Sequence, residues 1–401
     1  MKILYFTFIE NPFAPENAGV MRGQVINVLK EIACSDESID LHWLALINTK
    51  LYKPSETEIN NLKQELKEQK VNLTIESIPN GTTARKLFAV IRLLNKVKEL
   101  NPDIVHCRVY PSTLIALEAR KMYKLKYKVI FDARGVYPEQ ILERSPNFIG
   151  KVRFNYWKYL EKKLLKQSDL IIGVTNAFID HFKKINRNAN YKFIPCCVQI
   201  DDNYAYNHNN EIKTRIGFND KDIIVVYSGN LSAKYSSINQ IVEIFSNLKE
   251  LNPDIKYLVL TKSDTKELKI LLDSKNLLQN TKIFDLKPSE VQEYLSISNI
   301  GILYREKSIV NEVAMPTKFA EYLLGGLPVL ISRSIKGVAE IVEQNNLGIV
   351  LDEVRISQEE LSMLLNIDRH KCIKFARNFS TKVIAQTYID EYKNLFVNQA
   401  K

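Results

Sequence analysis

The sequence predicts an α/β protein made of two successive domains, each built around a parallel sheet. Apolar runs rich in β-branched and aromatic residues alternate with helical patterns along the chain, as they do in doubly wound α/β domains. Some runs, such as LIIGV (170–174), are apolar at every position, which is typical of strands covered by helices on both faces. The alternation breaks once, at the Asn- and Asp-rich segment 196–211, which we interpret as an interdomain connection.

The expected elements follow one another in a regular order. Short apolar runs predict the strands of the first domain at 2–8, 39–46, 71–78, 103–107, 128–133, 169–174 and 191–194. Amphipathic periodicity predicts the helices between them at 19–33, 56–69, 84–99, 111–122, 148–167 and 176–184. Strands of the second domain are expected at 222–229, 256–261, 281–285, 299–304, 327–332 and 347–351. A last helical pattern at 381–396 has no strand after it, so we expect domains at 1–198 and 199–380 and a C-terminal helix within 381–401.

The composition excludes several classes of protein. Of the 401 residues, 45% are hydrophobic and 25% are charged, which is ordinary for a globular protein and excludes a disordered or fibrous chain. The five cysteines form no CxxC pair, so we expect neither a disulfide framework nor a zinc cluster. The first apolar run is too short for a signal peptide, and no run approaches the roughly 18 apolar residues of a membrane span. We therefore expect a soluble, cytoplasmic protein.

The basic residues gather in the first domain. Residues 1–200 hold 31 Lys and Arg against 20 Asp and Glu, whereas the rest of the chain is almost balanced. Two helical patterns carry basic faces, formed by Arg85, Arg92 and Lys96 in one and by Lys151, Lys158, Lys162 and Lys166 in the other. Such faces are typical of solvated helices packed on a sheet, but they would also suit contact with the anionic inner face of a membrane. No pattern of a nucleic-acid-binding module occurs, so nucleic acid is not an expected partner.

The loops after the strands of the first domain hold candidate catalytic residues. Ligands of open parallel sheets bind beyond the carboxyl ends of the strands. The loop after the first strand lacks a GxGxxG fingerprint and reaches Gly19 at an expected helix start, where glycine either forms a turn or lets the backbone approach a phosphate or sugar. His106 and Arg108 follow the fourth strand, and Asp132 and Arg134 follow the fifth. Either they are satisfied core groups, or they line one pocket in which the arginines supply charge and Asp132 orients a hydroxyl or accepts a proton.

Two motifs stand out in the second domain. YSGNLSAKY (227–235) places Gly229 at a strand end and Lys234 beside the next helix start, where a cation is unfavourable unless an anion also binds. The alternative is an exposed, solvated Lys234. The other motif, in NEVAMPTKFAEYLLGGLPVLIS (311–332), consists of Pro316 at a helix start, Thr317 and Lys318 with free N–H groups, and Glu321 one turn later. This spacing would hold a phosphate and a hydroxylated ring together.

With these motifs the chain resembles the retaining GT-B glycosyltransferases of family 4. PTKFAEYLLGGLPVLIS (316–332) resembles the signature of that family's C-terminal domain, in which an acid precedes a Pro-Val strand. LLKQSDLIIGVTNAFIDHF (164–182) resembles the end of its N-terminal domain, and YSGNLSAKY resembles its glycine loop. The resemblance implies two Rossmann-like βαβ domains with an interdomain cleft, the acceptor domain at 1–198 and the nucleotide-sugar domain at 199–380. It also implies that the final helix packs back on the first domain.

The resemblance assigns roles to single residues. Glu321 matches the acid that holds the ribose hydroxyls of a nucleotide sugar. Lys234 and Lys318 fall where contacts to the donor phosphates are expected. Gly19 and Gly229 match the glycines of the family's two loops.

Two positions depart from the family pattern. Val313 stands where the family has a second acid, so the neighbouring Glu312 is the candidate for contact with the donor sugar. Asn230 stands where an arginine frequently follows the loop glycine, and it becomes the candidate donor contact there. These departures keep open a non-catalytic pair of GT-B domains that only binds. A nucleotide-sugar epimerase and a phosphorylase are further alternatives on the same fold.

The activity that the resemblance implies is transfer of a sugar from a UDP- or GDP-linked donor to an acceptor hydroxyl, with retention. Lys234, Lys318 and helix N–H groups would stabilise the charge on the leaving phosphate. No DxD cluster follows a strand, so we expect no metal and no cofactor. Attack is expected on the front face of the sugar, with the donor phosphate assisting deprotonation and no protein nucleophile. The expected acceptor is a lipid-linked or growing cell-surface glycan.

Overall fold

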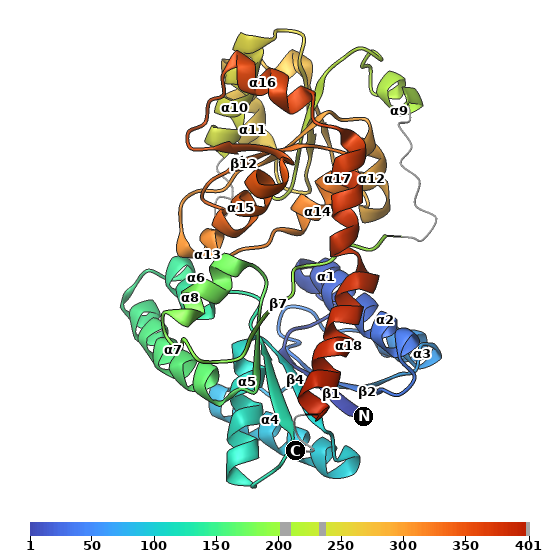
Figure 1. Ribbon diagram of the computed structural model, residues 1–401, viewed down its shortest axis with the longest axis vertical. Helices are drawn as coiled ribbons and strands as arrows, with labels where there is room; N and C mark the ends of the chain where they lie inside the picture. Colours follow the sequence, from blue (N-terminus) through green and yellow to red (C-terminus); the bar gives the residue numbers. More distant parts are fainter. Residues whose placement is uncertain (201–209, 232–237, 398–401) are drawn as a thin grey trace. The chain divides into compact units, whose positions relative to one another are not determined.

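The computed structural model describes residues 1–200, 210–231 and 238–397 and divides into two compact units (Figure 1). Unit 1 is formed by Met1–Gln199 and Thr381–Lys401, and unit 2 by Ile200–Ser380. Each unit is built on one parallel sheet with helices packed against it. The expected fold class, α/β with two parallel sheets, is confirmed.

The sheet of unit 1 has the strand order β3-β2-β1-β4-β5-β6-β7. Its strands are β1 (Lys2–Ile9), β2 (Asp40–Ile47), β3 (Val71–Ser77), β4 (Ile104–Arg108), β5 (Lys128–Asp132), β6 (Leu170–Gly173) and β7 (Tyr191–Phe193). Tyr5 of β1 pairs in parallel register with Trp43 of β2 on one side and His106 of β4 on the other. The order along the chain reverses between β1 and β4, so the loops after these two strands diverge and leave room for a ligand at the carboxyl edge.

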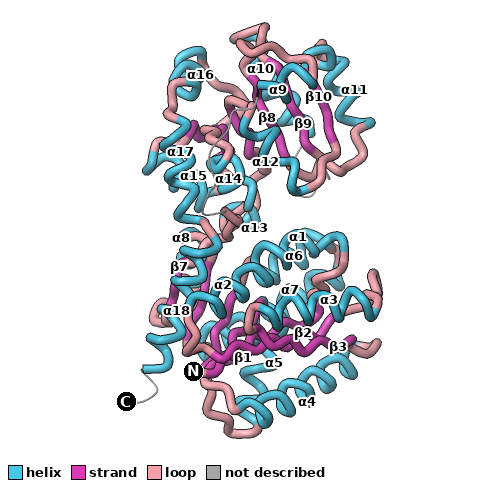
Figure 2. The backbone as a smooth tube through the Cα atoms, turned by 90° about the vertical axis from the view of Figure 1, so that its right-hand side faces the viewer, coloured by secondary structure: helices cyan, strands magenta, loops and turns pink. Residues whose placement is uncertain are grey.

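Helices cover both faces of this sheet, as Figure 2 shows for α3 and α4. The helices of unit 1 are α1 (Pro15–Met21), α2 (Asn27–Ser35), α3 (Glu56–Glu68), α4 (Thr82–Leu100), α5 (Val109–Met122), α6 (Tyr137–Arg144), α7 (Phe148–Gln167), α8 (Asn176–Lys183) and α18 (Thr381–Val397). α4 and α7 both pack against α5, whereas α18 packs against α2. The sequence did not predict α6, which lies in the stretch left as a loop after the fifth strand.

The first helix begins earlier than predicted. Pro15 occupies its first turn, where a missing N–H leaves no hydrogen bond unmade. Gly19 therefore lies within α1 and not at a helix start. A π-helical turn (Arg22–Ile26) joins α1 to α2, and Gln24 in this turn donates from Nε2 to the carbonyl of Cys197 at 2.7 Å and accepts the Cys197 N–H at 3.0 Å. This reciprocal pair ties the end of the first segment of unit 1 to the π-helical turn between α1 and α2.

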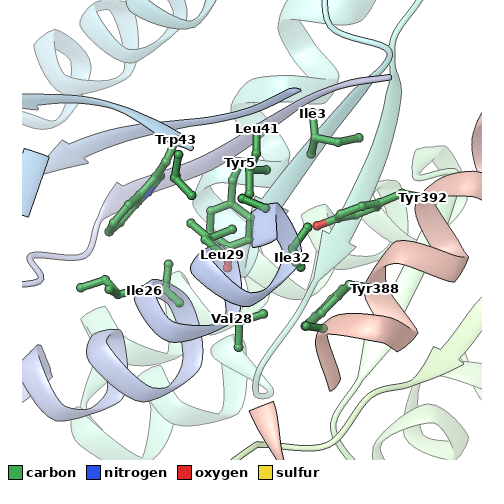
Figure 3. Close-up of a cluster of buried hydrophobic side chains, with 14 of the residues drawn as sticks. Ile3, Tyr5, Ile26, Val28, Leu29, Ile32, Leu41, Trp43, Tyr388 and Tyr392 are labelled. Atoms are coloured by element: carbon green, nitrogen blue, oxygen red, sulfur yellow. The ribbon is translucent and has the colours of Figure 1, made fainter. Parts of the chain in front are cut away.

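The C-terminal helix completes the hydrophobic core of unit 1. Figure 3 shows Tyr388 and Tyr392 of α18 beside Tyr5 and Ile32, which belong to β1 and α2. Both α18 tyrosines are at most 2% exposed. Burying a large apolar side chain stabilises a fold by about 1.5–3 kcal/mol, so the last helix in the chain is a structural part of the first unit.

The sheet of unit 2 has the order β10-β9-β8-β11-β12-β13, which repeats the pattern of unit 1 with its reversal between β8 and β11. The strands are β8 (Ile224–Ser228), β9 (Lys256–Leu260), β10 (Thr281–Phe284), β11 (Ile300–Leu303), β12 (Val329–Ser332) and β13 (Gly348–Leu351). The helices are α9 (Asn210–Arg215), α10 (Ile238–Leu251), α11 (Lys266–Ser274), α12 (Pro288–Ser296), α13 (Ile309–Glu312), α14 (Thr317–Leu324), α15 (Lys336–Asn345), α16 (Gln358–Leu365) and α17 (Arg369–Ala376). Arg369 of α17 donates to the carbonyls of Ser296 and Gly325, at the ends of α12 and α14.

Candidate active site

Backbone strain marks the carboxyl edge of the sheet of unit 1. Ile9, Val109 and Arg134 all have a positive φ, of 81°, 59° and 58°. They lie at the ends of β1, β4 and β5, which are neighbours in the sheet. A left-handed backbone is costly for β-branched residues, and strain of about 1–3 kcal/mol per residue gathers at functional sites. This edge is therefore the candidate site of unit 1.

A buried polar network lies at this edge, with Asp132 at its centre. Arg134 donates from Nε to Oδ2 of Asp132 at 2.9 Å. Nε2 of His106 lies 3.4 Å from the same oxygen, and its Nδ1 lies 2.7 Å from the hydroxyl of Tyr392. Arg134 also donates from Nη2 to the hydroxyl of Tyr388, which donates to Asp132 at 3.4 Å. Residues from β4, the end of β5 and α18 thus hold one another in place.

Burial and neighbouring charges shift the pKa of the Asp132 carboxyl in opposite directions. Burial would raise its pKa, but the charge of Arg134 and the hydrogen bond from His106 outweigh burial and hold the pKa well below its usual range. Burial lowers the pKa of His106, in spite of its contact with Asp132. At neutral pH the network therefore holds an ionised Asp132, a charged Arg134 and a neutral His106.

Unit 1 is expected to lose stability as the pH falls below about 6.5, the ordinary histidine pKa. The unfolded chain protonates His106 near that pH, whereas the folded chain resists protonation to lower pH. The unfolded state thus binds more protons between the two pKa values, and acid favours it. Urea unfolding followed by tryptophan fluorescence measures this, because both tryptophans, Trp43 and Trp157, lie in unit 1. His106→Gln should flatten the dependence between about pH 7 and pH 5, and an unchanged slope would contradict the assignment.

A second ion pair lies beside this network. Arg108, only 3% exposed at the end of β4, donates from Nε to Oε1 of Glu10 at 3.1 Å. Nη1 of Arg108 and Oε2 of Glu10 are buried and have no hydrogen-bond partner within the described part of the chain. Such atoms at a ligand-binding edge suit a polar ligand. Glu10 was not predicted as a site residue, although an acid directly after the first strand was a usable signal.

Four of the five candidates in unit 1 come together, and Gly19 does not. His106, Asp132 and Arg134 share one network, and Arg108 stands opposite Asp132 in the register of β4 and β5. Gly19 is exposed on α1, where an added Cβ would meet no atom within 4 Å. Its contact with a donor stays a prediction from the family resemblance.

In unit 2, α14 spans the point where the strand order reverses. The hydroxyl of Tyr322 accepts the N–H of Ser228, at the end of β8, at 2.8 Å and donates to the carbonyl of Ile302 in β11 at 3.1 Å. Gly229 follows Ser228 directly, and α14 begins at the carboxyl edge because it follows β11. The glycine loop and the start of α14 therefore reach the same edge of the sheet.

The predicted donor residues of α14 contact each other. Lys318 donates from Nζ to Oε2 of Glu321 at 2.7 Å, and their side chains are 30% and 26% exposed. From the sequence, these two side chains were expected to contact different parts of a ligand. Pro316 precedes the helix, and no side chain caps it, which leaves the first-turn N–H groups around Thr317 open to an anion.

The glycine loop after β8 is described only in part. The N–H of Gly229 donates to the carbonyl of Leu260 at 3.0 Å. Oδ1 of Asn230 accepts from the hydroxyl of Ser263 at 2.6 Å, which ties the loop to the end of β9. Lys234 lies outside the described residues, so its phosphate contact stays a prediction.

A cavity of about 670 Å³ opens at the carboxyl ends of β11, β12 and β13. Its volume lies within the range of small-molecule sites. Glu312, at the end of α13, lines the cavity together with Tyr304 and Arg305, whereas Val313 is 3% exposed. Of the predicted site residues that the structure describes, only Glu312 lines it. Across residues 1–200, 210–231 and 238–397, no group of three His, Cys, Asp or Glu side chains has an arrangement that could hold a metal ion.

Two family models match the chain in sequence. Glycosyltransferase Family 4 matches residues 60–202, and Glycosyl transferases group 1 matches residues 208–379. Together they span most of both units. A search of curated proteins gives no significant match.

Solved structures share the fold at low identity. The lipopolysaccharide outer core galactosyltransferase WaaB, in its apo form, has a TM-score of 0.70 at 14% identity over 98% of this chain and 99% of that chain. A glycosyltransferase from Rickettsia africae ESF-5 has a TM-score of 0.68 at 18% identity over 98% of both chains. Anabaena HepE, in complex with UDP and glucose, has a TM-score of 0.64 at 16% identity over 98% of this chain and 100% of that chain. Because the family models and the fold agree, the chain belongs to the group 1, family 4 glycosyltransferases, which are retaining enzymes of GT-B fold.

Proposed function

We propose that this glycosyltransferase takes its sugar from a UDP- or GDP-linked donor held by unit 2 and passes it to a glycan hydroxyl held by unit 1. The observation that carries the proposal is the position of Tyr322, which joins the ends of β8 and β11 to α14. A glycine loop, an open helix start and an acid then share one switch point, which suits a nucleoside diphosphate. The complex of Anabaena HepE with UDP-glucose supports a donor of this kind.

Several of the proposed donor-binding groups lie on α14. Glu321 accepts from the ribose hydroxyls, and Lys318 and the N–H groups of the first turn contact the diphosphate. The ion pair between Lys318 and Glu321 holds both side chains at the start of α14 before the donor arrives. Glu312 contacts the donor sugar from the wall of the cavity. Lys234 adds a second cation, and Gly229, Asn230 and Gly19 complete the donor contacts that the family resemblance implies.

In the proposed reaction the donor itself takes up the acceptor proton. The bond between the anomeric carbon and the phosphate oxygen breaks as the acceptor oxygen bonds to the same face of that carbon, and the proton passes to a phosphate oxygen. Lys318 and the helix N–H groups stabilise the charge on the leaving diphosphate. In unit 1, Arg108 and Arg134 bind the acceptor. Asp132 and His106, both at most 1% exposed, are positioning residues that hold Arg134.

The proposed acceptor is a lipid-linked or growing cell-surface glycan, reached from the inner face of a membrane. The excess of basic residues in 1–200 supports peripheral contact with anionic lipid. WaaB and WaaG, both structural neighbours, are named for lipopolysaccharide outer core galactosyl transfer and lipopolysaccharide biosynthesis. Among the described residues, no helix has the length and hydropathy needed to cross a membrane.

Nucleotide release from a panel of UDP- and GDP-sugars is expected to continue in EDTA. The physical reason is that Lys318 and the helix start supply the positive charge that a metal would otherwise supply. Slow hydrolysis of one donor without an acceptor, measured as free UDP or GDP, is the readout. Complete loss of nucleotide release in EDTA, with recovery of release after addition of Mg²⁺ or Mn²⁺, would contradict metal independence. Nucleotide binding without any cleavage would indicate a binding pair of domains, and interconversion of donor sugars would indicate an epimerase.

A further inference from the structure

The outer helix α7 exposes a row of large apolar side chains. We call this row the α7 stripe, and it consists of Phe148 (80% exposed), Ile149 (68%), Val152 (53%), Tyr156 (52%) and Tyr159 (72%). At helical spacing these positions share one side of α7, away from the face that buries Leu164 and Leu165. A contiguous exposed apolar surface of this kind marks a contact surface.

Only positive charge is exposed beside the α7 stripe on its own helix. Lys151, Lys162 and Lys166 are exposed, and within the described residues no ion pair holds them. The single acid of α7, Glu161, is fully buried and accepts from Lys158. The surface of α7 therefore combines apolar side chains with unpaired lysines and offers no carboxylate to a partner.

The other helix with a predicted basic face, α4, lacks this combination. Arg92 forms an ion pair with Glu76 at 2.8 Å, and Lys96 forms one with Glu99 at 2.9 Å. Arg85 donates from Nε to a backbone carbonyl at 3.0 Å. Because these cations already have partners within unit 1, they contribute less than the lysines of α7 to an outside contact.

The first residues of the α7 stripe lie toward the carboxyl edge of the sheet of unit 1. α7 ends just before β6 begins, and a parallel strand begins at the edge opposite its carboxyl end. The first residues of α7, Phe148 and Ile149, therefore lie toward the edge that holds Arg108 and Arg134.

We propose that the α7 stripe inserts into the interface of an anionic membrane while Lys151, Lys162 and Lys166 contact the lipid headgroups. Apolar side chains flanked by lysines are typical of helices that lie in a membrane interface. The lack of an exposed acid on α7 makes its charge complementary to anionic lipid. This consequence rests on the proposed function. Docking through the α7 stripe would bring the carboxyl edge of the sheet of unit 1, with Arg108 and Arg134, toward a lipid-linked acceptor.

Sedimentation with vesicles of phosphatidylcholine, with and without phosphatidylglycerol, tests the proposal. The wild type is expected to pellet with the anionic vesicles at low salt and to stay in the supernatant with pure phosphatidylcholine. Phe148→Ser/Ile149→Ser/Tyr159→Ser and Lys151→Gln/Lys162→Gln/Lys166→Gln should each reduce partitioning by roughly tenfold or more. The matched control Leu87→Ser/Ile91→Ser, which removes two exposed apolar side chains from α4, should leave partitioning unchanged. In Phe148→Trp, the added indole should shift its emission to the blue when anionic vesicles are added.

Equal partitioning of the stripe variant and the wild type would overturn the proposal. The proposal would also fail if the wild type did not bind anionic vesicles and eluted as a dimer, while the stripe variant eluted as a monomer. The α7 stripe would then be a self-association surface. Urea midpoints of the variants establish that each one folds. Calorimetry with UDP and GDP reports on the proposed function separately, because the stripe variant should bind nucleotide as the wild type does. Absence of nucleotide binding in the wild type would contradict the proposed function without changing the vesicle result.

Discussion

Asp132→Ala is expected to lower the unfolding free energy of unit 1 by about 3–5 kcal/mol, the usual effect of breaking a buried ion pair. The carboxyl is fully buried, and it compensates the charge of Arg134, whose side chain is only 8% exposed. Without the carboxylate, that cation stays buried and unpaired, and His106 and Tyr388 lose an acceptor. Urea unfolding followed by tryptophan fluorescence reports on unit 1 alone, since Trp43 and Trp157 both belong to it.

Two further variants separate charge burial from a general effect of losing a carboxylate. Glu65→Ala removes an acid that pairs with Arg22 and Lys30 at the surface, where its side chain is 33% exposed. It should lower the unfolding free energy of unit 1 by less than about 1 kcal/mol. Asp132→Ala/Arg134→Met removes both charges and should recover part of the lost stability. The network around Asp132 would have no stabilising role if Asp132→Ala lowered the unfolding free energy no more than Glu65→Ala does.

Glu321→Ala is expected to weaken nucleotide binding by about 10- to 150-fold, because a carboxylate that accepts from two hydroxyls contributes about 1.5–3 kcal/mol. The Glu321 side chain is one-quarter exposed, and among the described residues of unit 2 it forms an ion pair with Lys318, so the fold should tolerate its loss. Calorimetry with UDP and GDP measures the change, and nucleotide release from the preferred donor should fall in parallel.

The matched control for this variant is Glu267→Ala, which removes an exposed acid from the first turn of α11. It should bind nucleotide as the wild type does. An unchanged affinity of Glu321→Ala for both nucleotides would remove Glu321 from the site, whatever the activity of the protein.

Most strands were predictable because they contain a short apolar run, although β3 and β7 are mostly only half-buried. β4, β6 and β12 are buried at every position, so their sequences show the pattern without reference to the rest of the chain. α1 was harder, because its first turn is made of Pro15 and polar residues that also suit a loop. α6 follows a strained residue, Arg134, and has only two turns, which local periodicity does not distinguish from a loop.

The candidate site was predictable only where its residues lie close together in sequence. Asp132 and Arg134 are two positions apart, and Lys318 and Glu321 are one helical turn apart. Tyr388 and Tyr392 reach His106 and Asp132 from more than 250 residues away along the chain, and nothing local in their helix indicates that contact. For the same reason the pairing of Glu10 with Arg108 could not be read from either loop alone.

The place of α18 in the core of unit 1 also determines when that unit can finish folding during synthesis. A growing chain usually folds its first domain before the next one leaves the ribosome. Here the first domain lacks Ile384, Tyr388 and Tyr392 until the whole of unit 2 has been made. Until then the apolar side chains of β1 and α2 that α18 covers have no partner helix, so we expect a holdase chaperone to bind the earlier domain while the later one folds first.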